Sequence, residues 1–172
     1  IFIEKGAKLN FVTLNASSGP IYIGKDAEIM EGSVIRGPLA LCHNATIKLA
    51  TKIYGPTTVG PFSKVGGEVN NSVLFAYSNK GHDGFLGNSV LGEWCNIGAD
   101  SNNSNLKNNY AEVRLWDYET GGFARTGLQF FGLMMGDHSK CGINTMFNTG
   151  TVVGVSANIF GSGFPRNFVP SF

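Results

Sequence analysis

Apolar side chains recur every sixth residue through the first part of the chain. From residue 23 to residue 65 all eight positions at this spacing hold isoleucine, leucine or valine: Ile23, Ile29, Ile35, Leu41, Ile47, Ile53, Val59 and Val65. A second run occupies Met135, Cys141, Phe147, Val153 and Ile159. Four residues after most of these positions stands a small residue, such as Ser33, Ala45 or Ser63. The spacing predicts a six-residue unit that repeats over most of the chain.

This spacing excludes an amphipathic helix and favours short strands. Six residues make about 1.7 helical turns, so the apolar positions would spiral around a helix instead of forming one stripe. Short strands joined by sharp corners fit better, because every sixth side chain then points inward with a small residue beside it. A sandwich of strands would not keep an unbroken register from 23 to 65. We therefore expect an all-β solenoid.

The six-residue register is interrupted twice. The first interruption, GGEVNNSVLFAYSNKGHDGF, covers 66–85, and the second covers 101–132. Within the second, VRLWDY and FARTGLQFF lie on either side of ETGG, a pattern that predicts a β-hairpin outside the solenoid. Regular coils supply a rigid frame, so binding and catalytic residues are expected at the interruptions.

The amino-acid composition argues against several classes of function. With 15% charged residues, a formal net charge of +1 and no basic run, the chain has no signature of nucleic-acid binding. No segment approaches the roughly 20 apolar residues of a membrane span. Three widely spaced cysteines, Cys42, Cys95 and Cys141, favour free thiols in a cytoplasmic protein. Because the chain starts without methionine, we expect 1–172 to be a single domain from the C-terminal part of a longer protein.

The repeat resembles that of the hexapeptide-repeat proteins. The resemblance implies a left-handed parallel β-helix, a triangular prism with about three hexapeptides per coil. Many members transfer an acyl group from a thioester such as acetyl-CoA, which requires a base for the proton of the acceptor and donors for the oxyanion. His82 is the only histidine in an interruption and is our candidate for the base. Glu68, in the same interruption, is the candidate to accept the other ring N–H and fix the tautomer.

A narrower resemblance covers 79–100, NKGHDGFLGNSVLGEWCNIGAD. This segment looks like the acetyltransferase half of the bifunctional sugar-1-phosphate nucleotidyltransferases. That family carries Lys-x-Gly-His and then Val-Asn-Ile-Gly-Ala-Gly, which here become KGH and CNIGA. The match implies that His82 is the general base, that Asn96 contacts the acceptor sugar, and that the backbone of Ala99 lies near the thioester. MGDHSKCGINTMFNTGTVVG, at 135–154, is similar to later coils of the family.

The resemblance also implies the residues around the acceptor and the acyl carrier. Phe85 stands where the family has a tyrosine, and Asn70 stands where it has a lysine. The expected acceptor site comprises Lys80, Phe85, Asn96, Asn70 and Lys52, with Lys52, Lys64 and Arg36 as candidates for the sugar phosphate. The expected carrier site comprises Ala99, Asn105, Lys140 and Arg166.

The implied function is acetyl transfer from acetyl-CoA to the amine of a hexosamine 1-phosphate, a step in UDP-N-acetylhexosamine synthesis. The resemblance implies a homotrimer with active sites between neighbouring prisms. No metal is expected, because hexapeptide-repeat carbonic anhydrases need two zinc-binding histidines close in sequence, whereas His43, His82 and His138 are 39 and 56 residues apart. The alternative is a non-catalytic oligomerisation or regulatory domain of a sugar-1-phosphate nucleotidyltransferase.

Overall fold

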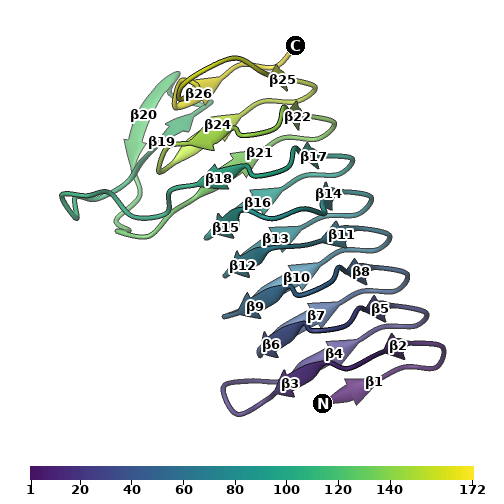
Figure 1. The fold of residues 1–172 in the computed structure, drawn as a ribbon. Coiled ribbons are helices and arrows are strands. Elements are labelled where there is room, and N and C mark those ends of the chain that lie inside the picture. Colours follow the sequence, from purple (N-terminus) through teal and green to yellow (C-terminus); the bar gives the residue numbers. More distant parts are fainter.

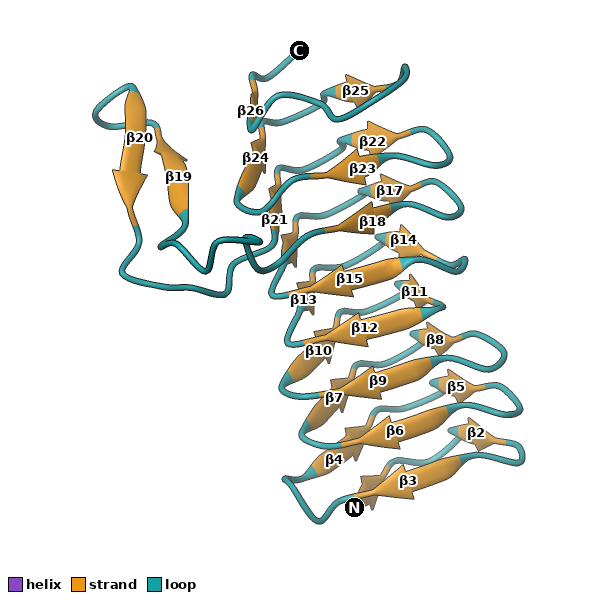
Figure 2. Cartoon of the chain, turned by 60° about the vertical axis from the view of Figure 1, so that its left-hand side comes forward, coloured by secondary structure: helices purple, strands orange, loops and turns teal.

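Short parallel strands follow one another around a triangular prism, and each coil of the chain stacks on the previous one (Figures 1 and 2). The computed structural model describes residues 1 to 172. It contains strands, turns and loops but no helix, and so no helix that could span a membrane. The coils wind in the left-handed sense (Figure 1), which confirms the expected left-handed parallel β-helix.

Three sheets form the faces of the prism. The first face contains β1 (Phe2–Ile3), β4 (Ile21–Ile23), β7 (Leu39–Leu41), β10 (Thr57–Val59), β13 (Val73–Leu74), β16 (Val90–Leu91), β21 (Leu133–Met135), β24 (Thr151–Val153) and β26 (Phe168–Val169). The second face contains β2 (Lys8–Leu9), β5 (Glu28–Ile29), β8 (Thr46–Ile47), β11 (Lys64–Val65), β14 (Asn79–Lys80), β17 (Asn96–Ile97), β22 (Lys140–Cys141) and β25 (Asn158–Ile159). The third face contains β3 (Thr13–Asn15), β6 (Val34–Arg36), β9 (Lys52–Tyr54), β12 (Glu68–Asn70) and β15 (Phe85–Gly87), followed by the pair β18 (Asn102–Asn103) and β23 (Met146–Phe147).

The inward rows of the three faces form one continuous core. The eight apolar residues of the first run are each at most 1% exposed, which confirms their predicted inward position. The small residues four positions later, including Ser33, Thr51 and Ser63, are buried at the corners. Cys141 is buried in the core, and the cysteines are free thiols. Burial of these apolar rows is the main stabilising contribution to the prism.

The coil persists through the first predicted interruption. The inward residues there are Val65, Val69, Leu74, Lys80, Leu86 and Leu91, all buried. Two residues are therefore missing from the corner at Gly66–Gly67, and one is missing from each of the corners after Val69 and Leu86. What interrupts the sequence pattern is a shift of register together with a lysine in an inward row. His82 lies at a corner of ordinary length.

The second interruption begins later than predicted. β18 still belongs to the regular coil, with Asn103 in its inward row. The amide of Asn103 bonds both the backbone N–H and the backbone carbonyl of Gly87, at 2.8 and 3.0 Å, so this polar side chain is satisfied inside the prism. Further along, β19 (Arg114–Asp117) and β20 (Gly122–Arg125) form the predicted antiparallel hairpin. Trp116 stacks on Phe168, with ring centroids 4.1 Å apart, and fixes the hairpin to the last coils.

A row of aromatic rings follows the corner between the first and second faces. Phe62, Tyr77, Trp94 and His138 occupy the same corner position in successive coils, each with φ of 59° or 60°. Successive rings lie within 9° of parallel, with centroids 5.1, 4.4 and 6.2 Å apart. We call these four residues the corner ladder.

Candidate active site

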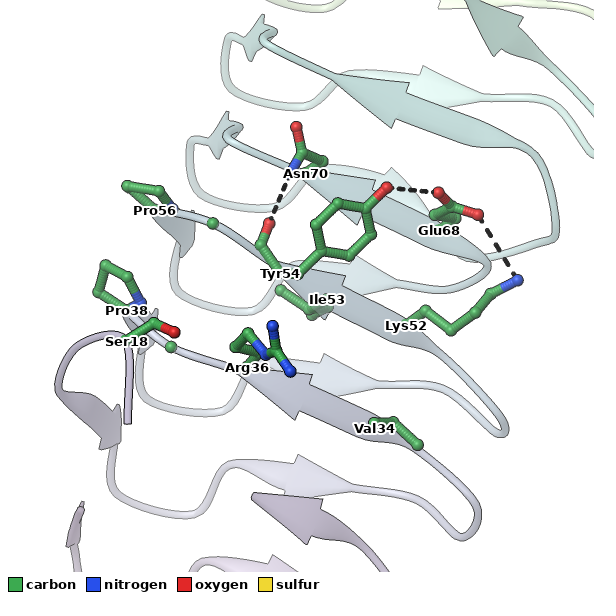
Figure 3. A pocket seen from close by; sticks show the side chains of 12 residues that line it. Ser18, Val34, Arg36, Pro38, Lys52, Ile53, Tyr54, Pro56, Glu68 and Asn70 are labelled. Atoms are coloured by element: carbon green, nitrogen blue, oxygen red, sulfur yellow. Dashed lines mark hydrogen bonds and ion pairs between the residues drawn. The ribbon is translucent and has the colours of Figure 1, made fainter. Parts of the chain in front are cut away.

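Outward side chains of the third face line a groove (Figure 3). Its volume is about 750 Å³, and its lining comes from β6, β9, β12 and the adjoining proline corners. Residues on either side of an inward residue face outward, so β9 presents Lys52 and Tyr54 while β12 presents Glu68 and Asn70. Parallel pairing sets Lys52 beside Glu68 and Tyr54 beside Asn70. The structure thus brings four of the predicted residues into one groove: Arg36, Lys52, Glu68 and Asn70.

Tyr54 and Lys52 both engage the Glu68 carboxylate. The Tyr54 hydroxyl donates a hydrogen bond to Glu68 Oε1 at 2.6 Å, and Lys52 Nζ lies 3.6 Å from Oε2 (Figure 3). The hydrogen bond to this carboxylate raises the pKa of Tyr54 above its ordinary value. Tyr54 was not among the residues predicted from the sequence. Its outward position on the same predicted strand as Lys52, one coil before Glu68, was the signal that could have found it.

Arg36 adds a second cation to this groove. It lies on β6, the neighbour of β9, and its guanidinium takes part in no ion pair within the chain. The Asn70 side-chain amide donates to the Tyr54 carbonyl at 3.0 Å and is held in place by that bond. Two cations and one carboxylate on a concave surface suit a ligand that carries both a phosphate and hydroxyl groups.

His82 lies on the corner turn between β14 and β15, with an exposed imidazole. The turn is held by neighbouring coils, because the carbonyls of Asp83 and Gly84 accept hydrogen bonds from the backbone amides of Asp100 and Glu68 at 3.0 and 3.2 Å. The turn therefore presents His82 at the edge of the third face, where the groove residues Lys52 and Glu68 also begin their strands.

The expected pairing of Glu68 with His82 is not formed within the chain. The Glu68 carboxylate is occupied by Tyr54 and Lys52, and only its backbone amide bonds the His82 turn. Phe85 follows the turn and pairs in register with Glu68, and its ring lies over Gly87 of the same strand.

Three other predicted residues lie close to the His82 corner. The corner that contains Ala99 stacks on the His82 corner through the Asp100–Asp83 backbone bond. Asn96 belongs to the outward row of the second face, where its Oδ1 accepts a hydrogen bond from Asn79 Nδ2 at 2.9 Å. Lys140 pairs in register with Asn96, one coil further on. The structure therefore groups Asn96, Ala99 and Lys140 on the coils that follow His82.

Lys80 is not at the surface, which corrects its expected place in the acceptor site. Its side chain is 2% exposed and points into the prism, where Nζ donates to the carbonyls of Gly66 and His82 at 2.9 and 2.6 Å. An outward contact with a sugar is not available to this side chain, because the register of β14 turns it inward.

Two predicted carrier residues lie away from the His82 corner. Asn105 donates to Asn88 Oδ1 at 2.8 Å, at the end of the third face opposite to the His82 turn. Arg166 lies between β25 and β26, in the last coil. Within one chain, neither residue is grouped with His82.

Comparison with known proteins places the chain among acetyltransferase sequences. It is 30% identical over 144 residues to the bifunctional sugar-1-phosphate nucleotidylyltransferase/acetyltransferase of Sulfurisphaera tokodaii, a match that covers 83% of this chain and 35% of that protein. It is 26% identical to the uncharacterized acetyltransferase YaiX of Escherichia coli, over 83% of this chain and 62% of that protein. It is 28% identical to the bifunctional protein GlmU of Methanocaldococcus jannaschii, over 69% of this chain and 26% of that protein.

The chain thus spans less than two thirds of the length of each of these relatives. No model of a protein family matches the chain. A solved UDP-N-acetylglucosamine acyltransferase aligns over 92% of this chain and 64% of its own, with 12% identity and a TM-score of 0.35, too low to inform function. The β-helical chain is therefore similar in sequence to proteins named acetyltransferases, among them bifunctional sugar-1-phosphate nucleotidylyltransferase/acetyltransferases.

Proposed function

We propose that this chain is an acyl-CoA-dependent acyltransferase that acetylates the amine of a hexosamine 1-phosphate. The observation that carries the proposal is the position of His82. Its exposed imidazole stands at a corner between a groove with two cations and a row that contains Asn96 and Lys140. The kinship with sugar-1-phosphate nucleotidylyltransferase/acetyltransferases supports the same chemistry.

The groove of the third face would bind the acceptor. Arg36 and Lys52 supply positive charge for the phosphate, while Tyr54, Glu68 and Asn70 offer hydrogen-bonding groups for sugar hydroxyls. Lys52, Glu68 and Phe85 lie side by side on the adjacent strands β9, β12 and β15, which are about 4.8 Å apart. An acceptor bound in the groove can therefore reach the His82 corner, which precedes Phe85.

His82 would act as the general base. It takes the proton from the attacking amine as the nitrogen bonds to the thioester carbonyl carbon. The tetrahedral intermediate then collapses, the C–S bond breaks, and the proton passes from the imidazole to the leaving thiolate. Backbone amides near Ala99 are the candidate donors to the oxyanion.

The donor, acetyl-CoA, would lie along the second face, beside Asn96 and Lys140. We further propose a homotrimer, in which Asn105 and Arg166 can serve the groove of a neighbouring prism although they are remote from His82 within one chain. Free cysteines and the use of CoA are consistent with a cytoplasmic enzyme that forms the C-terminal part of a longer nucleotidyltransferase.

A second candidate is a non-catalytic scaffold or regulatory domain. The observation that favours it is Phe85, which offers no hydroxyl beside Glu68 where the bifunctional family has a tyrosine. Tyr54 does bring a hydroxyl to Glu68, but from the preceding coil. A measurement of acetyl-CoA turnover distinguishes the acyltransferase from the non-catalytic domain.

The test is a steady-state assay with acetyl-CoA and a panel of hexosamine 1-phosphates, in which release of CoA thiol and formation of the N-acetyl product are both measured. We expect His82→Ala to lower kcat by roughly 10²- to 10⁴-fold, because a general base contributes about that much. Arg36→Gln should instead raise KM for the acceptor by about 10-fold and leave KM for acetyl-CoA unchanged, since it removes only a phosphate contact.

Absence of turnover with every acceptor in the wild type would favour the scaffold. Equal activity of the wild type and His82→Ala would remove His82 from the mechanism even if the chain is an acetyltransferase.

A further inference from the structure

A lysine occupies a buried row that is otherwise apolar. On the second face, the inward positions of β5, β8 and β11 hold Ile29, Ile47 and Val65, and β14 places Lys80 next in this row. Lys80 is among the largest fully buried side chains of the molecule. A charged group in such a place is unfavourable unless its hydrogen-bonding capacity is used.

Regular corners between the second and third faces contain buried hydroxyl groups. Ser33 Oγ donates to the carbonyl of Lys48, one coil further on, at 2.9 Å. Ser101 Oγ donates in the same way to Gly142, at 3.2 Å. These serines stand four residues after an inward residue, and each satisfies a carbonyl that follows the inward residue of the next coil.

The two corners around His82 lack this hydroxyl. At Gly66–Gly67 the residue that would carry it is missing, because that corner is two residues short. On the next coil the equivalent position is Gly84, where an added Cβ would clash with the Ser101 carbonyl. The Lys80 ammonium reaches both corners from inside the prism, donating to the carbonyl of Gly66 on one corner and to that of His82 on the other.

The His82 turn depends on such bonds, because Gly81 and Gly84 on either side give it little stiffness of its own. The carbonyls of Asp83 and Gly84 are held by backbone amides of neighbouring coils. The carbonyl of His82 is held by Lys80, at 2.6 Å.

We propose that Lys80 is a positioning residue, which anchors the His82 turn from inside the prism and so holds the imidazole at the edge of the groove. The inference rests on the proposed function for its catalytic consequence, but the anchoring itself is independent of it.

The charge state of Lys80 agrees with this role. Burial lowers the pKa of its amine to about 8, while the negative charges of Asp83 and Asp100 favour the protonated form. Near neutral pH the amine is therefore an ammonium with three N–H donors for the two corners.

The test compares Lys80→Leu and Lys80→Met with the wild type. Both variants restore an apolar side chain of the kind found elsewhere in the row, so the prism should fold. Lys48→Leu, at the equivalent corner of an earlier coil but in contact with solvent, removes the same charge and is the control. Intact mass and circular dichroism establish that each variant keeps the fold.

Hydrogen exchange read by mass spectrometry reports on the anchor without any substrate. We expect amides of the 81–85 turn to exchange about 10-fold faster in both Lys80 variants, because the turn opens more readily, and to be unchanged in Lys48→Leu. In acetyl transfer, kcat should fall about 10-fold in the Lys80 variants, with both KM values within about twofold, as expected when a base is displaced but binding is intact.

Unchanged exchange at 81–85 in the Lys80 variants overturns the inference, whatever the activity. Faster exchange with an unchanged kcat overturns the positioning role. Faster exchange in a protein whose wild type shows no turnover supports the anchor and overturns the proposed function instead.

Discussion

Lys80 carries an energetic consequence that is separate from its effect on His82. Its amine has a pKa of about 8 in the fold, against 10.5 in the unfolded chain, because burial disfavours the charged form. Between these two pH values the unfolded chain binds more protons than the fold, so unfolding becomes less favourable as pH rises. Below pH 8 the destabilisation is constant, at roughly 3 kcal/mol from the difference in pKa.

We therefore expect the free energy of unfolding of the wild type, relative to Lys80→Leu, to increase from pH 8 to pH 10.5 and to be flat below pH 8. Denaturant titrations of both proteins at several pH values measure this difference, and the comparison cancels the titration of tyrosines and other groups. Parallel curves for the two proteins over the whole range would contradict the burial of a titrating amine.

At the residue scale, the stacking of coils explains the groove better than the catalytic corner. Lys52, Glu68 and Asn70 lie together because parallel pairing aligns equivalent outward positions, even though the coil that joins them is two residues short. The partner of Glu68 was not predictable in this way, since both His82 and Tyr54 were within reach and only the direction of the side chain decides between them. The inward position of Lys80 could not be predicted, because it depends on three residues missing from two earlier corners, at Gly66–Gly67 and after Val69.

At the element scale, the corners set the conformational constraints. The left-handed region, with φ near 60°, disfavours bulky residues, yet the corner ladder places Phe62, Tyr77 and Trp94 there. Stacking offsets this strain, since an aromatic pair contributes about 0.5–1.5 kcal/mol beyond its buried area. Trp94 stacks on both of its neighbours, at 4.4 Å from Tyr77 and 6.2 Å from His138.

Trp94→Asn should lower the free energy of unfolding by about 1 kcal/mol. Asparagine tolerates the left-handed conformation, which recovers part of the strain, but both stacks are lost. Thermal unfolding measures the change, with Ser156→Asn as the matched control at a corner outside the ladder that has the same φ region. A variant as stable as the wild type would mean that the ladder does not stabilise the coil.

For the second interruption, the sequence pattern predicts the hairpin but not the residue at which the regular coil ends. The hairpin of β19 and β20 was predicted from its alternating strands and Gly-Gly turn, and it forms. Its starting point was set too early, because Asn103 in an inward row looks like the end of the solenoid. The side-chain amide satisfies both of its hydrogen-bonding groups on Gly87, so a polar residue is tolerated where the pattern calls for an apolar one.

On the scale of the whole molecule, the first face is the most apolar outer surface. Its outward row contains Phe2, Tyr22, Ala40, Thr58, Val73, Val90 and Met134. The outward row of the second face is polar by contrast, with Thr46, Lys64, Asn79, Asn96 and Lys140. Apolar side chains exposed in one row favour association with another copy of the prism.

If the proposed homotrimer uses the first face, Val73→Lys should dissociate it, because a charge would be buried in the interface. Thr46→Lys on the second face should leave the trimer intact. Light scattering coupled to size exclusion gives the mass of each. A monomeric wild type would contradict the trimer, and a trimeric Val73→Lys would exclude this face as the interface.

The fold as a whole could be predicted because the same pattern of inward and corner residues recurs in every coil of a solenoid. Each coil repeats the same inward residues and small corner residues, so a few irregular coils do not hide the pattern. The relation between the groove and the His82 corner could not be predicted in the same way. It depends on the register of β12 and β15, and hence on which corners are short.

The short corners have a consequence for recognising relatives of this chain. Four residues are absent between Val65 and Leu91, and each absence moves the later residues out of the six-residue frame. A sequence search that requires a strict six-residue period detects the repeat up to Val65 and detects it again only from about Leu91. The stretch in between contains Glu68, Lys80 and His82. Sequence alignments that permit gaps only at the corners, and that match inward residues to inward residues, would include these coils.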